Sequence, residues 1–375
     1  MNRYSRKKPR TNQFERLLKI VNILVLIGLL LGCLSVYISP ISFVIPAFFG
    51  ISFMIWFIVN TVLLLIWIYI RRLFFLIPLI GFVAGIQNFT HIVQFNSNSN
   101  PEGIKVLSYN VRLFDINNWY SNPIKENHKK IIDFVGEEKP DIVCFQEFFT
   151  DDSGEFPVLD LLLSKKGIPK YYHIDYFQTR RKTYHWGIAT FSNYPIINRE
   201  RYQFRNSIGN YCVYTDVIKS SDTIRIFNVH MESWHFKEED YDFITDVKND
   251  LDINSKSMHR LKNIYWKMSS SYQKRSVQTL ELVDLIKESP YSVIVCGDFN
   301  DTPVSYSYSK INNVLTDSFL EAGNGFGSSY SGVLPIFRID YIFHSNEFDA
   351  INYKTYKKDY SDHHPISVYL KRKSK

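Results

Sequence analysis

The N-terminal part of the chain contains long runs of apolar residues with almost no charged side chains, a composition that few soluble folds contain. Between residues 20 and 91 the only charged side chains, His91 aside, are Arg71 and Arg72. The stretch consists of three apolar runs, Ile20 to Ile38, Ile41 to Ile70 and Leu73 to Ile86. The first two are long enough to cross a hydrocarbon core about 30 Å thick as helices. The third reaches that length only if it continues through Gln87 and Asn88, and we expect about three transmembrane helices. A cleaved signal peptide would explain the first run but not the two that follow.

Basic residues indicate which ends of these spans face the cytoplasm. Seven Lys and Arg precede the first span, and Arg71 and Arg72 separate the second from the third. Under the positive-inside rule both groups are cytoplasmic. Three spans then place the rest of the chain outside the cytoplasmic (inner) membrane, whereas two spans would leave it in the cytoplasm. We expect three, because Arg71 and Arg72 would otherwise lie in the middle of one merged apolar segment.

The net charge of the chain belongs to this N-terminal region. The formal charge is +7, but residues 1 to 91 hold nine Lys and Arg against a single acid, Glu15. The remainder has 35 basic and 36 acidic residues, a balance of about −1. The basic excess is therefore explained by membrane topology and by attraction to anionic lipids. It gives no evidence of a nucleic-acid-binding face. The four cysteines show no spacing typical of zinc and are expected to be buried thiols.

Beyond residue 104, polar side chains recur at the ends of apolar strands. Tyr291 to Val295 is a run of the kind that is buried on both faces of a sheet. Asp298 and Asn300 follow it two residues apart, so they point the same way. A carboxylate beside a carboxamide suits phosphate chemistry, because the acid binds a cation or takes a proton while the amide donates to an oxyanion. The Gly-Asp-x-Asn pattern is also a common turn composition.

Five further segments carry the same kind of signal. Each joins an apolar strand to a group that binds metals or moves protons, and these groups are Asn110, Glu147, His230, Asp340, and Asp362 with His363. Because an acid within an apolar strand needs a partner, we expect Asp340 to pair with a histidine and to fix its charge and tautomer. Taken singly, each residue has a plainer explanation, such as a loop cap at Asn110 or a core histidine at His230.

In their order along the chain, the six segments resemble the signature of the endonuclease/exonuclease/phosphatase superfamily. The family pattern is strand-Asn, Gln-Glu, Asn-x-His, Gly-Asp-x-Asn, an Asp before an aromatic strand, and Ser-Asp-His-x-Pro. The chain matches every element within about 104 to 371. The resemblance implies an α+β fold, a four-layer αββα sandwich, whereas composition alone predicts only a mixed α and β domain. Further strands are expected at 171–177, 187–192, 211–217 and 224–230, and helices at 127–138 and 274–288.

The resemblance also implies a metal site. Asn110, Glu147 and Asp362 would arrange oxygen ligands around Mg²⁺ or Mn²⁺, with Glu147 the principal ligand. Hard divalent cations take such ligands and usually keep several waters. The family also carries a Tyr or Glu on a middle strand, for which the candidates here are Tyr184, His185 and Trp186.

The remaining roles implied by the resemblance concern proton transfer and phosphate binding. Asp298 would orient and deprotonate the attacking water, and Asn300 would hold the phosphoryl group. His363, kept cationic by Asp340, would donate to a non-bridging oxygen. His230 would donate to the phosphoryl group from the other side.

These observations divide the chain into a basic cytoplasmic tail (1–17), a transmembrane anchor (18–94), a linker (95–103) and a catalytic domain (104–371). We expect a membrane-anchored, divalent-metal-dependent phosphoesterase that hydrolyses a phosphodiester or phosphomonoester with activated water. The substrate is left open between a lipid headgroup, a small molecule and nucleic acid. Alternatives are a tethered nuclease and a non-catalytic binding module. Residues 232–273 form a polar insertion that is either a lid or partner surface, or a solvated excursion.

Overall fold

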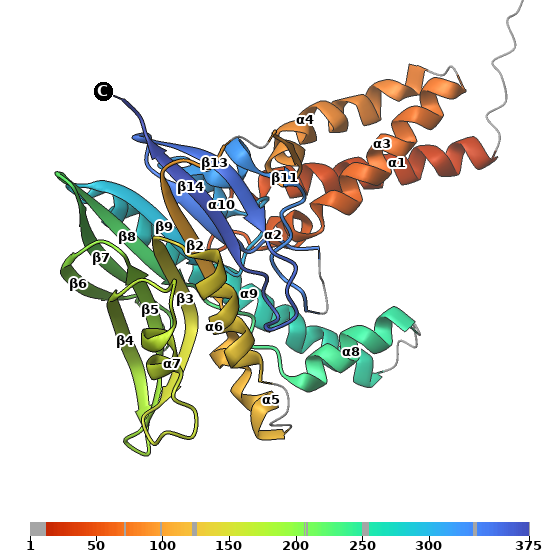
Figure 1. Ribbon diagram of the computed structural model, residues 1–375. Coiled ribbons are helices and arrows are strands. Elements are labelled where there is room, and N and C mark those ends of the chain that lie inside the picture. The colour runs from red at the N-terminus through yellow and green to blue at the C-terminus, as the bar shows by residue number, and fades with distance from the viewer. Residues whose placement is uncertain are drawn as a thin grey trace, which may run out of the picture.

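The computed structural model describes residues 13–70, 73–97, 100–121, 126–205, 207, 209–249, 255–332 and 336–374 (Figure 1). Most of the basic tail, together with Arg71 and Arg72, lies outside these ranges. The orientation predicted from their charge therefore stays a prediction.

The N-terminal helices form a bundle that projects from one end of the molecule (Figure 1). Its members are α1 (Gln13–Leu34), α3 (Phe53–Tyr69) and α4 (Leu76–Ile92), the last preceded by the short η1 (Leu73–Phe75). The third apolar run does continue through Gln87 and Asn88, and the 20-residue segment Leu73–Ile92 is long and apolar enough to cross a membrane. The same is true of α1.

The second apolar run is not one straight helix. It forms α2 (Ile45–Ile51) and α3, which meet at Ser52 with a bend of 71°. The Ser52 hydroxyl donates to the Phe48 carbonyl at 3.0 Å and accepts from Trp56 Nε1 at 2.9 Å. A third span therefore depends on α2 and α3 acting together as one broken span.

Tertiary packing explains why α2 leaves the bundle direction. Phe48 of α2 stacks on Tyr265, with ring centroids 5.1 Å apart, and meets the edge of Tyr272 at 5.5 Å. A Cβ at Gly50 would collide with the carbonyl oxygen of Val304. Only glycine permits this close approach, so α2 lies directly on the domain that follows.

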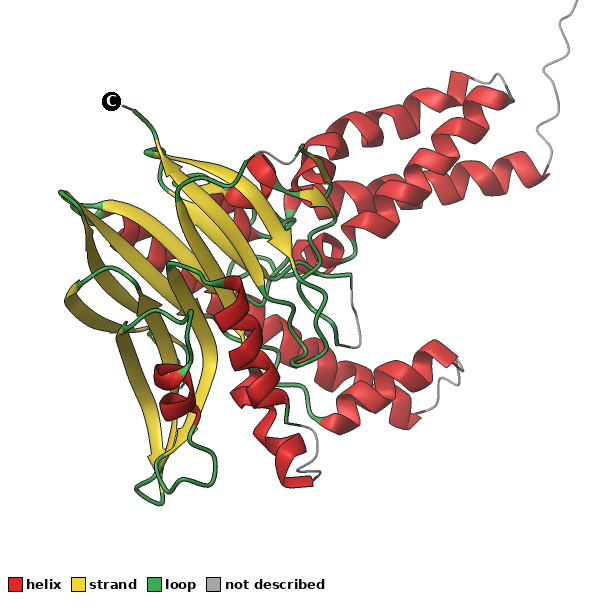
Figure 2. Ribbon diagram, in the orientation of Figure 1, coloured by secondary structure: helices red, strands yellow, loops and turns green. Residues whose placement is uncertain are grey.

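The rest of the chain contains two six-stranded sheets packed face to face (Figure 2). The first has the order β13 (Phe348–Thr355), β14 (Ile366–Arg372), β2 (Ile104–Asn110), β3 (Ile142–Asp151), β5 (Tyr184–Ser192) and β4 (Tyr171–Arg180). The second has the order β10 (Thr316–Asp317), β12 (Asp340–His344), β9 (Ser292–Asp298), β8 (Asp222–His230), β7 (Tyr211–Lys219) and β6 (Ile196–Gln203). Their inner faces share one apolar core.

Helices cover the outer faces of both sheets. The first sheet is covered by α6 (Asn127–Glu138) and α7 (Val158–Ser164), and the second by α9 (Ser255–Lys287) and α10 (Tyr306–Asn312). The expected αββα sandwich is confirmed. The shorter elements are η2 (Arg112–Asp115), α5 (Ile116–Ser121), α8 (Glu238–Asn249), α11 (Ser318–Ala322), β1 (Gln94–Phe95) and β11 (Asn324–Gly325).

Strand direction brings the polar strand ends together. In each sheet one central pair is parallel, β2 with β3 and β8 with β9, and the other pairs are antiparallel. The register places Asn110 opposite Gln146, and His230 opposite Asp298. Asp340, at the start of β12, lies opposite Asp298 from the other side. The carboxyl ends of the four parallel strands therefore meet at one edge of the sandwich.

Besides the two-residue strands β1, β10 and β11, two longer strands were not expected from the sequence, β6 and β13. Both are outermost in their sheets, where one edge faces solvent and charged residues are common. The helix expected at 274–288 is the second half of the 33-residue α9. Its first half and α8 make up much of the insertion 232–273.

The bundle is joined to the sandwich by specific contacts. The Ser35 hydroxyl, after α1, donates to the Val304 carbonyl at 2.9 Å. Arg338 Nη2 donates to the His91 carbonyl in the last turn of α4, also at 2.9 Å. Strand β1, at the start of the predicted linker, pairs with β11. The helices are therefore held against the sandwich at fixed points.

Candidate active site

Asp298 lies at the centre of the strand-end cluster and is almost fully buried. Its Oδ1 accepts from the backbone N–H of Asn300 at 2.8 Å, and its Oδ2 accepts from Asn110 Nδ2 at 3.0 Å. Strand β9 reaches this position because Gly297 has no side chain, since a Cβ there would collide with the Val229 carbonyl of β8. Burial raises the pKa of Asp298, an effect that the neighbouring histidines oppose.

A buried hydrogen bond joins His363 and Asp340. His363 Nδ1 donates to Asp340 Oδ2 at 2.8 Å, and its Nε2 lies 3.7 Å from Asp298 Oδ2. Burial alone would lower the pKa of His363, but the carboxylates of Asp340 and Asp298 raise it well above the usual value. The Ser329 hydroxyl accepts from the backbone N–H groups of Ile339 and Asp340, each at 3.0 Å, and fixes the start of β12. Asp340 thus pairs with a histidine, as its place in an apolar strand predicts.

Glu147 enters the site from a break in β3. Its φ is +50°, and the pairing of β3 with β5 shifts register between Phe145 and Phe148. This bulge re-aims the side chain. Glu147 Oε1 lies 3.2 Å from Asn110 Nδ2 and 3.5 Å from His230 Nε2. Within the described ranges no Lys or Arg pairs with Glu147, and 34% of its side chain is exposed.

Asp362 lies on the other side of Asn110. The Ser361 hydroxyl donates to the Asn110 carbonyl at 2.9 Å, so the loop before β14 is held against the end of β2. Asp362 Oδ2 is 3.6 Å from Arg112 Nε. That distance is longer than a direct charged hydrogen bond, so the carboxylate keeps capacity for another partner.

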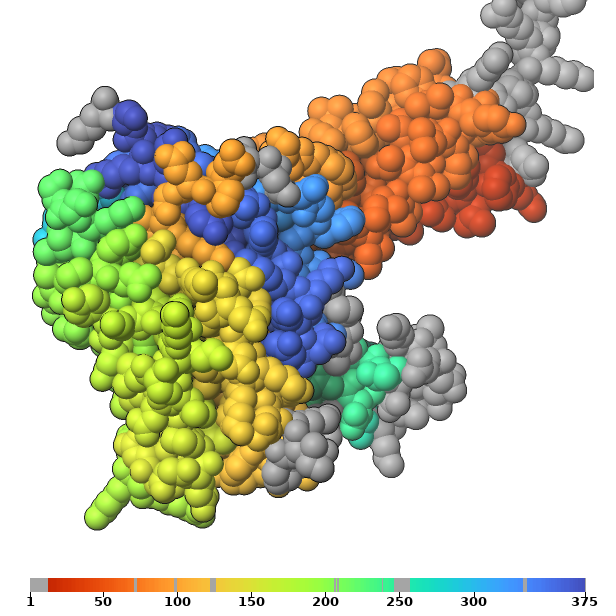
Figure 3. Space-filling model, viewed as in Figure 1, coloured from red at the N-terminus to blue at the C-terminus, as the bar shows by residue number. Residues whose placement is uncertain are grey.

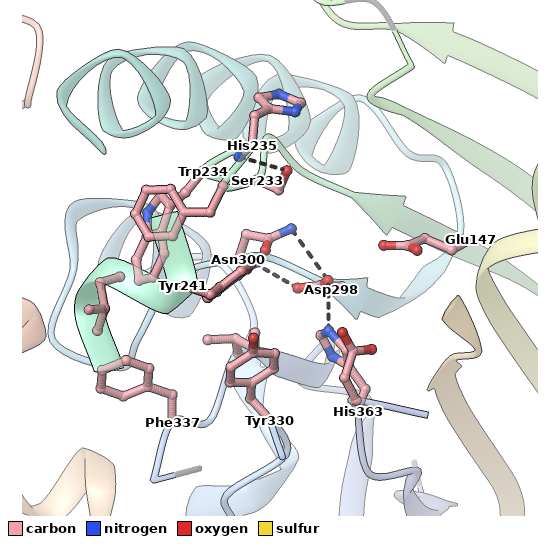
Figure 4. Close-up of a pocket in the computed structure, with 14 residues that line it drawn as sticks. Glu147, Ser233, Trp234, His235, Tyr241, Asp298, Asn300, Tyr330, Phe337 and His363 are labelled. Carbon is pink, nitrogen blue, oxygen red and sulfur yellow. Dashed lines mark hydrogen bonds and ion pairs between the residues drawn. The ribbon is translucent and has the colours of Figure 1, made fainter. Parts of the chain in front are cut away.

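One cavity of about 200 Å³ brings most of these residues together (Figure 4). Five of the predicted site residues line it, namely Glu147, Asp298, Asn300, Asp362 and His363. His230 and Asn110 are in contact with this set through Glu147 and Asp298. Atoms of Asp298, Asp340 and His363 also lie within 4.8 Å of one another, close enough to hold a metal ion.

The opposite wall of the cavity comes from residues that the sequence did not identify. The insertion contributes Trp234, Phe236 and Tyr241, and the chain before β12 contributes Tyr330 and Phe337. Figure 4 shows Trp234, Tyr241 and Phe337 on the side of the cavity away from Glu147, whereas the Tyr330 ring lies beside His363, with ring centroids 5.4 Å apart. The insertion is therefore part of the pocket wall rather than only a surface excursion.

Two buried side-chain amides, those of Gln146 and Asn228, hold together the strands that carry the site residues. Gln146 Nε2 donates to Asn228 Oδ1 at 2.7 Å, which joins β3 of one sheet to β8 of the other. Asn228 Nδ2 also donates to the Ala189 carbonyl at 3.0 Å. Both residues stand within the Gln-Glu and Asn-x-His patterns, which is the signal that could have identified them. Tyr184, His185 and Trp186 are not among the residues that line the cavity.

Comparison with known families gives two matches. Residues 107–363 match the model of the endonuclease/exonuclease/phosphatase family, and residues 15–92 match a domain of unknown function (DUF8431). A comparison with curated proteins returns no match.

Solved structures support the same fold. An endonuclease/exonuclease/phosphatase from Bacteroides vulgatus superposes with a TM-score of 0.52 and 16% identity, over 72% of this chain and 99% of that one. A conserved protein of unknown function from Enterococcus faecalis gives a TM-score of 0.52 and 12% identity, over 72% and 100%. A family protein from Leptotrichia buccalis gives 0.50 and 16%, over 72% and 100%. At such low identity these likenesses concern the fold alone.

Proposed function

The chain belongs to the endonuclease/exonuclease/phosphatase family, and on that basis we propose that it is a membrane-anchored, divalent-metal-dependent phosphoesterase. It would hydrolyse a phosphodiester or phosphomonoester with activated water. The observation that carries this proposal is the convergence of the family's residues, from six separate segments, on one cavity edge. A binding module on the same fold would not require the carboxylates and histidines to meet in this way.

We place the metal at Asn110, Glu147 and Asp362. Glu147 and Asp362 offer carboxylate oxygens of the kind that Mg²⁺ and Mn²⁺ prefer, and no Lys or Arg pairs with Glu147 in the described ranges. The Asn110 amide would turn to present its oxygen, because its Nδ2 donates to Glu147 and Asp298 while its Oδ1 accepts from the Arg112 N–H. The group of Asp298, Asp340 and His363 suits an ion less well, because His363 and Asp340 are already joined by a 2.8 Å hydrogen bond. When bound, the metal would supply positive charge to a phosphate oxygen or to the leaving oxygen.

The protein side chains would carry out the proton transfer and bind the phosphoryl group. Asp298, held by Asn110 and Asn300, would orient a water and take its proton as the water oxygen bonds to phosphorus. One ester bond from phosphorus to oxygen breaks, and the leaving oxygen departs as an alcohol after taking up a proton. His363, kept cationic by Asp340, would donate to a non-bridging oxygen. His230 would donate from the opposite side.

For topology, we propose the division made from the sequence, with an anchor at 18–94, a linker at 95–103 and the catalytic domain at 104–371. The start of α1, the end of α3 and the start of η1 lie at the end of the bundle away from the sandwich (Figure 1). Basic residues are concentrated in the sequence at these two places. Under the positive-inside rule this supports an extracytoplasmic catalytic domain.

The proposal is tested with the full chain in detergent micelles, supplied with Mg²⁺ or Mn²⁺ and assayed on a phosphate monoester, a diester and DNA. We expect turnover that is abolished by a chelator and restored by the metal. Glu147→Gln should lower kcat/KM by at least about 10²-fold, since removal of one group that stabilises transition-state charge costs this much.

Glu155→Gln is the matched control, because Glu155 is an exposed acid outside the cavity. Equal activity in both variants, or turnover that persists in chelator, would refute the proposal. Preference for DNA with a steep loss of affinity in salt would instead support the tethered nuclease.

A further inference from the structure

A second cavity lies where the N-terminal helices meet the sandwich, and we call it the junction groove. It has a volume of about 330 Å³. One wall comes from α2, α3 and the end of α4, and includes Met54, Ile58 and Ile92. The other wall comes from the loop after β9 and the chain before β12, and includes Pro303 and Ile336. The lining is almost entirely apolar.

The one charged residue in the lining is not available to a ligand. Arg338 has only 2% of its surface exposed, and its Nη1 donates to Asp317 at 2.7 Å. Its Nη2 donates to the His91 carbonyl. Both terminal nitrogens are thus engaged with the protein, and Nε is buried without a partner among the described residues, so the groove offers its occupant hydrocarbon contacts rather than an exposed charge.

The junction groove adjoins the candidate active site. Phe337 lines both cavities. The loop after β9 does the same, because Asn300 faces the active site while Thr302 and Pro303 line the groove. Two residues of extended chain span at most about 7 Å. The two cavities therefore lie next to each other, with Phe337 in the wall of both.

The groove also opens toward the lipid-facing surface of the bundle. Ile55 and Ile58, on the α3 wall, are 61% and 52% exposed. On the opposite lip, Phe326 and Ile336 are 55% and 63% exposed. An exposed apolar patch that runs into a cavity marks an interaction site for protein or membrane. Here the patch is continuous with a helix of the apolar bundle, which favours membrane lipid.

Helices α8 and α9 lie near the candidate active site, and α9 also exposes apolar side chains. Helix α8 projects from the sandwich on the same side as the bundle, and the space-filling view shows a hollow between the two (Figures 1 and 3). The adjoining part of α9 exposes Met258, Leu261 and Trp266. Aromatic and apolar side chains of this kind are typical of the membrane interface.

Because the two cavities share Phe337 and the junction groove opens beside exposed apolar residues of the helix bundle, we infer that the substrate is a phosphate ester of a membrane lipid. Its hydrocarbon chain occupies the junction groove while its phosphate reaches Glu147, Asp298 and His363. This inference rests on the proposed phosphoesterase function, and the reaction is the same hydrolysis. It favours a lipid over nucleic acid, which would leave the groove unused.

The test compares homologous substrates that differ only in chain length. Full-length protein in micelles is assayed on glycerol phosphate and on diacyl glycerol phosphates with short chains, each with a methyl diester counterpart and each below its own aggregation limit. Each buried CH₂ is worth roughly fourfold in affinity. We therefore expect kcat/KM to rise at least about tenfold with chain length until the groove is filled.

Variants connect this preference to the groove. Phe326→Ser and Ile336→Ser make its exposed lip polar, and should lower the advantage of the longer chain several-fold. The matched control is Ile197→Ser on β6, where the isoleucine is 52% exposed and remote from the groove. It should leave the advantage unchanged.

The outcomes separate this inference from the proposed function. Turnover that is independent of chain length, or highest on DNA, would overturn the lipid assignment and leave the phosphoesterase standing. If no substrate is turned over, binding of non-hydrolysable phosphonate analogues decides the matter. Affinity that rises with chain length and falls in the lip variants would support the groove and refute the activity, whereas affinity independent of chain length would refute both.

Discussion

Asp317 and Arg338 form a buried ion pair in the sandwich, and Arg338 also bonds the helix bundle through the His91 carbonyl, so loss of the pair should be costly. Arg338 Nη1 and Asp317 Oδ2 are 2.7 Å apart, and neither side chain is more than 1% exposed. Tyr308 also donates its hydroxyl proton to Asp317 at 2.9 Å. Asp317→Asn would keep the volume but leave the guanidinium buried without a counter-charge. Breaking such a pair from one side costs about 3–5 kcal/mol.

The measurement is urea denaturation of the full chain in micelles, followed by circular dichroism. Urea is preferred because a salt denaturant would screen the charges. With a dependence of about 1–3 kcal/mol per molar urea, the midpoint should fall by at least about 1 M. Asp133→Asn is the control, since its pair with Lys165 is exposed, and such surface pairs contribute about 0–1 kcal/mol.

A double variant distinguishes the cost of an unpaired buried charge from a general loss of packing at these two positions. Asp317→Leu with Arg338→Met removes both charges, and replacement of a buried pair by apolar groups is often neutral. We expect the double variant to recover part of the stability, although the His91 carbonyl and the Tyr308 hydroxyl lose partners. Equal midpoints for Asp317→Asn and Asp133→Asn would refute the reasoning, because they would mean that the buried pair is hydrated like a surface pair.

Three further predictions concern the sandwich and the site. Gly297→Ala should force β9 away from the Val229 carbonyl, with a cost of at least about 1–3 kcal/mol by urea denaturation and a loss of turnover. Asp340→Asn should lower kcat by about 10²–10⁴-fold with folding retained, because it removes the charge that orients His363; a change in KM alone would contradict that role. Burial lowers the pKa of His173 to about 4, so the unfolded chain binds a proton more readily than the folded one. The unfolding free energy should therefore fall as pH drops from 6.5 to about 4, and a His173→Gln variant should show a flatter profile.

Local patterns in the sequence were sufficient to predict several features of this protein. The apolar N-terminal runs stand out because a spanning helix needs about 20 consecutive apolar residues. Strand β9 was readable because burial on both faces makes it continuously apolar up to Asp298. Strand β8 was readable from its apolar residues before His230, although Arg225 and Asn228 interrupt them. The edge strands β6 and β13 were missed because charged and polar residues interrupt their apolar pattern.

The contribution of the insertion to the pocket wall could not be predicted from local sequence patterns. Residues 232–273 are polar and charged, which is typical of a solvated excursion. Trp234, Phe236 and Tyr241 nevertheless reach the cavity, because packing of α9 on the second sheet brings the insertion across the strand ends. No local periodicity encodes that contact.

The sequence by itself identified the apolar N-terminal runs and the polar residues at strand ends, because each depends on chemistry within a few consecutive positions, and the resemblance of the six segments to the family pattern implied the sandwich fold. Only the tertiary structure decided which residues meet. It bent the second apolar run at Ser52 so that α2 lies on Val304, paired Arg338 with Asp317, and placed Phe337 in the walls of both the junction groove and the candidate active site. Such contacts join segments up to hundreds of residues apart, and they arise when separate apolar surfaces pack together to exclude water.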